Sequence, residues 1–219
     1  MKTEKFITAD GSHTLFVPQI NEHYHSVNGA VQESEHIFIE AGLKQCKKQK
    51  INVLEIGFGT GLNAFATFLA KENTAINYTS LELYPIDPNE AILLNFPEQM
   101  SLADRPFFEN MHFAPWNQEV SMDANFVLHK IQADVTKYIF ANKKGYDLVF
   151  FDAFSPEKQP EMWSKEVFSC IFAACNPEAI LTTYCAKGSV RRLLQQVGFL
   201  VERLPGPIGK REILRARKP

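Results

Sequence analysis

Residues 54–63 read LEIGFGTGLN, a glycine-rich turn between an apolar run and a helical pattern. Its three glycines are Gly57, Gly59 and Gly61. The preceding residues, INVLEI at 51–56, are typical of a buried strand, and a helix is expected at 62–70. Glycines in such a turn let the backbone approach a ligand closely. The GxGxG spacing, without the GK[ST] ending of a P-loop, favours a methionine-adenosine ligand over a pyrophosphate; a tight turn without a ligand is the alternative.

Apolar β-type runs alternate with helical stretches on both sides of this turn, through residues 51–200. This order is the signature of parallel β-α-β units, so the sequence predicts an α/β fold with a doubly wound, mostly parallel sheet. Further strands are expected at 78–83, 126–131, 146–151 and 179–184, and further helices at 135–141, 165–175 and 188–197. The last two strands, 199–204 and 211–215, are separated only by PGPIG. Such a link is too short for a crossover helix, so this pair should be antiparallel.

The chain of 219 residues fits a single domain, 1–219. Its first 50 residues do not follow the alternation and contain an amphipathic stretch at 31–43, which predicts a helix beside the sheet. We therefore expect a substrate-side cap segment, 1–50, on a Rossmann-like core, 51–219. Within this core, the proline- and aromatic-rich segment 95–125 is expected to be an ordered insertion at one sheet edge.

The composition excludes several classes of protein. With 45% hydrophobic and 22% charged residues the chain can form a compact core, and no apolar run approaches the length of a membrane span. The N-terminus has no apolar secretion signal, so a cytoplasmic protein is expected. The net charge is −2, yet residues 187–219 carry nine Lys or Arg against two Glu. This basic C-terminal segment is a candidate polyanion surface, although a solvated helix face explains Arg191 and Arg192 equally well.

Cysteines and histidines give no metal-binding pattern. The four cysteines form no CxxC pair and are expected to be free thiols, and the six histidines lack ligand spacing. We therefore expect no metal. His23 and His25 are interpreted as polar surface residues.

Carboxylates follow the predicted strands where a nucleoside cofactor would need them. Glu82 ends the second strand, where related folds bind ribose hydroxyls. Asp134 follows the third strand and is a candidate for the adenine amino group, with a helix N-cap as the alternative. Glu55, before the glycines, is a candidate for orienting the turn or the amino group of the cofactor. Asn63, after the glycines, is also expected to bind the cofactor.

The segment FFDAFSPEKQPEMW, residues 150–163, places Asp152 at the carboxyl end of a central strand. Open α/β sheets bind ligands outside these strand ends, so Asp152 is the expected catalytic residue. Phe154 and Trp163 are candidates for stacking on a planar base, with aromatic core packing as the alternative.

Four motifs together carry a specific resemblance: LEIGFGTGLNAF, DAFSPEKQPEMW, TTYCAKGSVRRLLQQVGF and GKRE. They resemble the methyltransferase domain of the bacterial tRNA 5-methylaminomethyl-2-thiouridine biosynthesis enzymes (MnmC- and MnmD-like), and HYHSVNGAVQESEHIFI extends the resemblance toward the N-terminus. The family pattern D-x-F-x-P-x-K-x-P-x-M-W is matched throughout, whereas Ala153 and Ser155 differ from many relatives.

The resemblance implies a class I, S-adenosyl-L-methionine-dependent methyltransferase. The expected reaction converts 5-aminomethyl-2-thiouridine at the tRNA wobble position to its methylaminomethyl form, without the flavin oxidoreductase activity of fused relatives. A separate oxidoreductase is a possible partner. By hypothesis, Asp152 helps to deprotonate the substrate amine, and Tyr24, Ser26 and Glu33 complete the substrate wall. The candidates for phosphate contacts around the anticodon arm are Lys158, Lys187, Arg191, Arg192, Lys210 and Arg211.

Two alternatives share the fold. The first is a small-amine methyl- or aminopropyltransferase, against which the basic C-terminal segment, residues 187–219, argues. The second is a binding module that keeps the cofactor pocket without catalysis, against which Asp152 argues.

Overall fold

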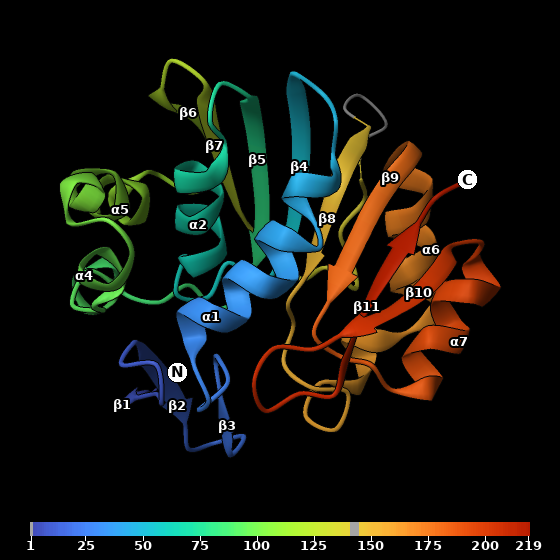
Figure 1. The fold of residues 1–219 in the computed structure, drawn as a ribbon, viewed down its shortest axis with the longest axis horizontal. Coiled ribbons are helices and arrows are strands. Elements are labelled where there is room, and N and C mark those ends of the chain that lie inside the picture. Colours follow the sequence, from blue (N-terminus) through green and yellow to red (C-terminus); the bar gives the residue numbers. More distant parts are fainter. Residues whose placement is uncertain (1, 141–144) are drawn as a thin grey trace.

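The computed structural model describes residues 2–140 and 145–219, and its main element is a twisted eight-stranded sheet (Figure 1). Five parallel strands form its centre: β4 (Lys50–Ile56), β5 (Ala75–Glu82), β7 (Phe126–Gln132), β8 (Tyr146–Phe151) and β9 (Cys175–Thr183). Antiparallel strands close both edges: β6 (Gln118–Asp123), β10 (Leu200–Pro205) and β11 (Glu212–Arg217). The strand order is β10-β11-β9-β8-β4-β5-β7-β6. The predicted α/β fold with its C-terminal antiparallel hairpin is confirmed.

Helices cover the two faces of the sheet and form two cores (Figure 1). One face is covered by α1 (Ala30–Ser34) with its π-helical continuation (Glu35–Glu40), α2 (Leu62–Ala70) and α5 (Arg105–Phe113). The other is covered by α6 (Lys165–Ala174) and α7 (Gly188–Val197). Strand β4 serves both cores, because its alternate side chains point to opposite faces: Ile51 and Val53 pack into the first, Leu54 and Ile56 into the second.

The strand order places a crevice beside β4. The next strand along the chain, β5, pairs with one edge of β4, and the later strand β8 pairs with the other edge of β4. In a doubly wound sheet this reversal leaves a ligand site at the carboxyl ends of the strands. Two backbone hydrogen bonds hold the strand ends together: Gly57 N donates to Leu81 O over 2.9 Å, and Asp152 N donates to Ile56 O over 3.0 Å.

The N-terminal segment forms a small antiparallel sheet that the sequence did not predict. Its strands are β1 (Glu4–Ile7), β2 (His13–Val17) and β3 (Glu22–His23). The predicted amphipathic helix follows as α1 and its π-helical continuation. Glu22 accepts hydrogen bonds from Ser155 N (3.1 Å) and Ser155 Oγ (2.9 Å), which ties this segment to the loop after β8.

The predicted helix at 135–141 is wrong. Residues 135–137 form a turn and 138–140 are irregular, while residue 141 lies outside the described part. The Asp134 carboxylate accepts hydrogen bonds from Thr136 N (3.0 Å) and Thr136 Oγ1 (2.6 Å), as a helix N-cap would. The backbone bonds that follow, Lys137 N to Asp134 O (3.0 Å) and Tyr138 N to Val135 O (3.3 Å), span three residues and not the four of an α-helix, so the segment stays a turn.

The segment 95–125 is an ordered insertion, as predicted. It contains α4 (Phe96–Met100), a 3-10 turn (Leu102–Asp104), α5 and the edge strand β6, and the short α3 (Pro88–Ala91) precedes it. Within residues 2–140 and 145–219, none of the helices combines the length and apolar character needed to cross a bilayer.

Candidate active site

A cavity of about 540 Å³ opens at the carboxyl ends of β4, β5 and β8. Its walls include the glycine turn, Asp152 and residues 22–27 of the N-terminal segment. Eleven of the predicted site residues line it: Tyr24, Ser26, Glu33, Gly57, Gly59, Asn63, Glu82, Asp134, Asp152, Phe154 and Lys210. Lys210 reaches it from the loop between β10 and β11. The fold thus gathers residues from widely separated parts of the chain into one site.

The glycine turn leaves no room for side chains. Gly57 has φ +93°, and a β-carbon there would lie 2.7 Å from the carbonyl oxygen of Asp152. At Gly59 a β-carbon would lie 3.0 Å from the Tyr24 ring. Gly61 does not line the cavity but caps α2 in a left-handed conformation, with φ +73°. The turn therefore presents bare backbone to the cavity, as a closely bound ligand requires.

Glu82 holds the glycine turn from the neighbouring strand. Its carboxylate accepts hydrogen bonds from Gly59 N (3.1 Å) and Tyr84 N (2.8 Å). Burial raises the pKa of Glu82 above its ordinary value, whereas the backbone hydrogen bonds oppose this shift. Asp134 lies at the next strand end and forms an ion pair with Lys137 (3.1 Å). Carboxylates at two adjacent strand ends thus face the same cavity.

Asp152 is partly buried, and its position is fixed by a relay of hydrogen bonds. Asn63 Nδ2 donates to Asp152 Oδ2 over 2.8 Å, and Ser34 Oγ donates to Asn63 Oδ1 over 2.6 Å. Burial and then the negative charge of Glu33 raise the pKa of Asp152 to about 7, although Asn63 and Lys210 oppose the shift. A carboxyl group with this pKa can both accept and release a proton at neutral pH.

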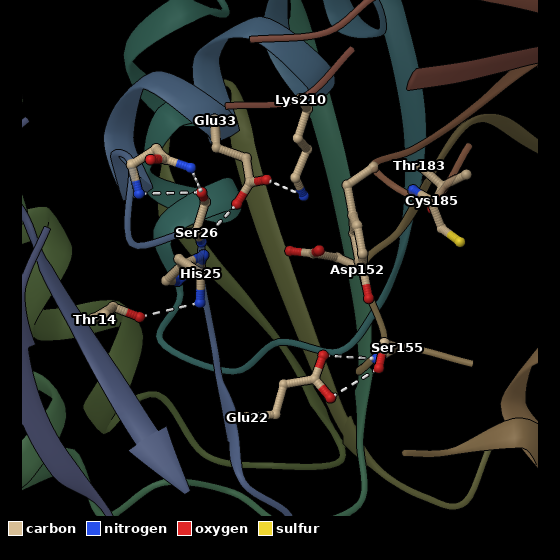
Figure 2. Close-up of polar contacts among 12 residues, drawn as sticks. Thr14, Glu22, His25, Ser26, Glu33, Asp152, Ser155, Thr183, Cys185 and Lys210 are labelled. Carbon is tan, nitrogen blue, oxygen red and sulfur yellow. Dashed lines mark hydrogen bonds and ion pairs between the residues drawn. The ribbon is translucent and has the colours of Figure 1, made fainter. Parts of the chain in front are cut away.

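A charged pair lies opposite Asp152 (Figure 2). Glu33 Oε2 accepts a hydrogen bond from Ser26 N over 2.9 Å, and Glu33 Oε1 forms an ion pair with the Lys210 ammonium. The same ammonium lies 4.2 Å from the centre of the Tyr184 ring. The sequence analysis had considered Lys210 as a phosphate contact, but in the structure its ammonium faces into the cavity.

His25 and Tyr184 are cavity residues that the sequence analysis missed. His25 Nε2 is hydrogen-bonded to Thr60 Oγ1 over 2.6 Å, and burial lowers the pKa of His25 to about 4. The interpretation of His25 as a polar surface residue is therefore wrong, because the N-terminal segment folds over the glycine turn. Tyr184 follows β9 directly, so the strand-end rule that selected Asp152 could have found it. Its hydroxyl donates to Ala153 O over 2.9 Å.

Glu55 and Trp163 lie behind the cavity wall. Glu55 is fully buried and accepts a hydrogen bond from Ser80 Oγ over 2.7 Å, and burial raises its pKa to about 8. Trp163 is 4% exposed, donates its indole N–H to Phe154 O over 2.8 Å and packs on Phe151. Core packing, the alternative for Trp163, is what the structure shows, whereas Phe154 lines the cavity against the Tyr24 ring.

The remaining basic candidates lie outside the cavity. Lys158, Lys187 and Arg211 are exposed and Arg191 is half-buried on α7, while Lys187 forms an ion pair with Glu157. In the part of the chain that the structure describes, no three His, Cys, Asp or Glu side chains are grouped to hold a metal ion.

The sheet order and the glycine turn at its reversal point define a Rossmann-like fold of the class I methyltransferase type. The chain belongs to the S-adenosyl-L-methionine-dependent methyltransferase family, because the profile of the family with that description matches residues 101–219. S-adenosyl-L-methionine is therefore its cofactor.

Curated relatives agree with the resemblance seen in the sequence. The tRNA 5-methylaminomethyl-2-thiouridine biosynthesis bifunctional protein MnmC of Nitrosospira multiformis is 30% identical over 219 residues, covering 94% of this chain and 35% of that protein. The protein of the same name from Azoarcus sp. is 30% identical over 205 residues, covering 89% of this chain and 32% of that protein. The chain thus spans about one third of the length of these relatives.

Solved structures show the same fold. The crystal structure of MnmC2 from Aquifex aeolicus has a TM-score of 0.82 at 27% identity, covering all of this chain and 72% of that one. Spermidine synthase from Thermotoga maritima has a TM-score of 0.59 at 12% identity, covering all of this chain and 72% of that one, which shows a common fold alone.

The residues present fit S-adenosyl-L-methionine. The turn at Gly57 and Gly59 offers bare backbone to the methionine part, and the partly buried carboxylate of Glu82 can accept hydrogen bonds from ribose hydroxyls. Leu83 and Val135 line the cavity together with Asp134, and this combination of apolar side chains and a carboxylate suits an adenine ring with its amino group. These residue assignments are proposals, with Asn63 placed between the turn and Asp152.

We expect Glu82→Gln to raise the dissociation constant of S-adenosyl-L-methionine about tenfold, because one charged hydrogen-bond acceptor for ribose is lost. Isothermal titration calorimetry measures this change. The control is Glu166→Gln in the exposed first turn of α6, for which the affinity should not change. Unchanged affinity in Glu82→Gln would remove the ribose assignment.

Proposed function

We propose that this chain N-methylates 5-aminomethyl-2-thiouridine at the wobble position of tRNA, giving 5-methylaminomethyl-2-thiouridine. The observation that carries the proposal is Asp152, a partly buried carboxyl group with a pKa raised to about 7, in the same cavity as the glycine turn. The printed names of the curated relatives support the choice of substrate. With tRNA as its substrate, the activity is proposed to be cytoplasmic.

Asp152 acts as the proton acceptor in the proposed mechanism. An aminomethyl group is mostly an ammonium at neutral pH and has no free lone pair. The Asp152 carboxylate accepts a hydrogen bond from this ammonium, takes its proton and leaves the nitrogen lone pair free to attack. Bound S-adenosyl-L-methionine would supply the electrophilic methyl group for that nitrogen, with the electron pair of the broken C–S bond remaining on its sulfur. Asp152 then passes the proton to solvent.

The protein's other contribution is alignment. Asn63 fixes the Asp152 carboxylate on one side of the cavity. Tyr24, Ser26 and Phe154 enclose the uracil ring of the substrate on the other side. Holding an amine and a methyl donor in line converts a two-body encounter into a one-body step. Closure by the N-terminal segment, which Glu22 ties to Ser155, also excludes water from the reacting groups.

The tRNA itself is proposed to bind through its anticodon arm along the basic C-terminal segment, residues 187–219, and the loop after β8. Lys158, Lys187, Arg191, Arg192 and Arg211 are the candidates for phosphate contacts. Within these 219 residues we propose methyl transfer alone. The aminomethyl substrate must come from a reaction that exposes a primary amine on the uridine, and a separate oxidoreductase partner is proposed to carry it out.

The deciding experiment mixes the purified protein with methyl-labelled S-adenosyl-L-methionine and tRNA that lacks only the final methyl group. We expect label in 5-methylaminomethyl-2-thiouridine after nuclease digestion and chromatography. Fully modified tRNA is the matched control and should accept no label. Label in a polyamine but not in tRNA would contradict the proposal and favour a small-amine transferase.

A further inference from the structure

The cavity contains a cation of its own. Lys210 reaches in from the loop between β10 and β11, and its side chain is 25% exposed against 9% for the Glu33 side chain that it pairs with. Among the described residues that line the cavity, Lys210 is the one Lys or Arg. Figure 2 shows its ammonium directed at Glu33, with the Asp152 carboxylate below this pair in the view.

The surroundings of the Lys210 ammonium are those of a binding site for a primary amine. Glu33 supplies a carboxylate, and the face of the Tyr184 ring lies 4.2 Å away. A carboxylate combined with an aromatic face is a recurrent way to bind an alkylammonium group. Both partners are held independently of Lys210: Glu33 accepts from Ser26 N, and Tyr184 donates to Ala153 O.

The charges of Glu33 and Lys210 both act on Asp152. Glu33 raises the pKa of Asp152 and Lys210 lowers it, so the pair lies close enough to influence the proton acceptor. The pKa of Glu55 on β4 is raised mainly by burial and further by the charge of Asp152. His25 stays neutral, because burial lowers its pKa to about 4. An ammonium bound at Glu33 would therefore lie within the electrostatic reach of Asp152.

We propose that Glu33 and the Tyr184 ring form the binding site for the ammonium of the substrate, and that Lys210 occupies this site until the substrate replaces it. The inference rests on the proposed function, since it takes the substrate to be a primary amine. Replacing one ammonium by another leaves Glu33 paired, so the exchange avoids an uncompensated carboxylate at a nearly buried position.

Lys210 can leave without rearranging the fold. Its side chain has four flexible methylene groups, so rotation alone moves the ammonium away from Glu33. The loop keeps its backbone bonds meanwhile: Gly206 N donates to Arg211 O (3.1 Å), and Lys210 N donates to Pro207 O (2.9 Å). Glu33 likewise remains held by Ser26 N.

The test compares two small probes, 5-aminomethyluracil and 5-hydroxymethyluracil, binding to the protein with S-adenosylhomocysteine present. The first probe carries an ammonium group where the second carries a neutral hydroxyl group. We expect calorimetry on the wild type to show about tenfold tighter binding of the aminomethyl probe, the worth of one charged hydrogen bond. Equal binding of the two probes would overturn the proposal without reference to any variant.

Two variants then separate the roles. Glu33→Gln keeps an acceptor for Ser26 N and should abolish the preference for the aminomethyl probe. Lys210→Met removes the competitor and should tighten binding of the aminomethyl probe about tenfold, with no change for the hydroxymethyl probe. A phosphate or scaffold role for Lys210 predicts no such gain, so weaker or unchanged aminomethyl binding in Lys210→Met would overturn the exchange.

Matched controls are Glu35→Gln, an exposed carboxylate two residues from Glu33, and Lys165→Met, an exposed lysine at the start of α6. Both should bind the probes as the wild type does. The probes report binding without methyl transfer, whereas the tRNA assay reports transfer. A selective site in a protein that does not methylate tRNA would therefore refute the proposed function alone, and tRNA methylation without probe selectivity would refute the ammonium site alone.

Discussion

Asp152→Asn is expected to lower the rate of methyl transfer about 100- to 10,000-fold, the usual contribution of a positioned general base. Asparagine is nearly isosteric and keeps an oxygen that can accept from Asn63 Nδ2, so the cavity should keep its shape. Affinity for S-adenosyl-L-methionine should be nearly unchanged, since Glu82 and the glycine turn hold the cofactor in our assignment. Single-turnover kinetics with calorimetry on the same samples measures both quantities.

The pH dependence distinguishes a base from a purely structural residue. Because the pKa of Asp152 is raised to about 7, the wild-type turnover should rise with pH through about 7 and then level off. Residual turnover in Asp152→Asn should instead keep rising with the fraction of neutral amine. A variant that keeps the limb near pH 7, or that loses cofactor affinity together with rate, would contradict the assigned division of roles.

Asp152→Asn should make the folded protein more stable, although it lowers the rate of methyl transfer. The folded-state pKa of about 7 exceeds the ordinary value of 3.8, so the folded protein holds this proton more tightly than the unfolded chain. The contribution of Asp152 to the free energy of unfolding therefore falls as pH rises from 3.8 to about 7. We expect Asp152→Asn to raise the melting temperature more at a pH above this window than at an acidic pH.

The second large effect is expected from Gly57→Ala. Gly57 has φ +93°, and the new β-carbon would lie 2.7 Å from the backbone oxygen of Asp152, which cannot rotate away. The backbone conformation alone would then cost about 1–2 kcal/mol of strain. In addition, the contact with Asp152 would displace the end of β8 relative to the turn. The variant should be less stable and should lose most of its S-adenosyl-L-methionine affinity, as measured by thermal unfolding and calorimetry.

Gly11→Ala separates backbone strain from damage to the site. Gly11 has φ +85°, similar to Gly57, but its β-carbon would meet only the flexible end of Gln99, at 3.7 Å. It should lose stability and keep cofactor affinity. If Gly57→Ala bound S-adenosyl-L-methionine as Gly11→Ala does, close approach of the ligand to this turn would be excluded.

Much of the fold followed from local patterns. The run YDLVFF at 146–151 is apolar on both faces, and it forms the central strand β8 with those bounds. Helix α2 begins after the glycines and α7 ends at Gly198, which adopts a left-handed C-cap with φ +113°. The short PGPIG link between the last two strands left only an antiparallel pairing. In each case neighbouring residues in the chain contain the information.

The predictions failed where distant residues decide the environment. Trp163 could have faced a ligand or the core, and only the packing of Phe151 and Phe168 against it places it inside. His25 joined the cavity wall because the N-terminal segment folds over the glycine turn, where its Nε2 is hydrogen-bonded to Thr60 Oγ1 over 2.6 Å.

The sequence by itself determined the five parallel strands of the sheet, the cofactor turn and the placement of Asp152 at a strand end, because these depend on periodicity and on glycine stereochemistry. Tertiary structure alone decided which charges surround Asp152. Glu33 and Lys210 come from opposite ends of the chain, and no local pattern specifies that they pair over the Tyr184 ring. Burial strengthens such long-range electrostatics, so the proton affinity of the site is a property of the folded molecule.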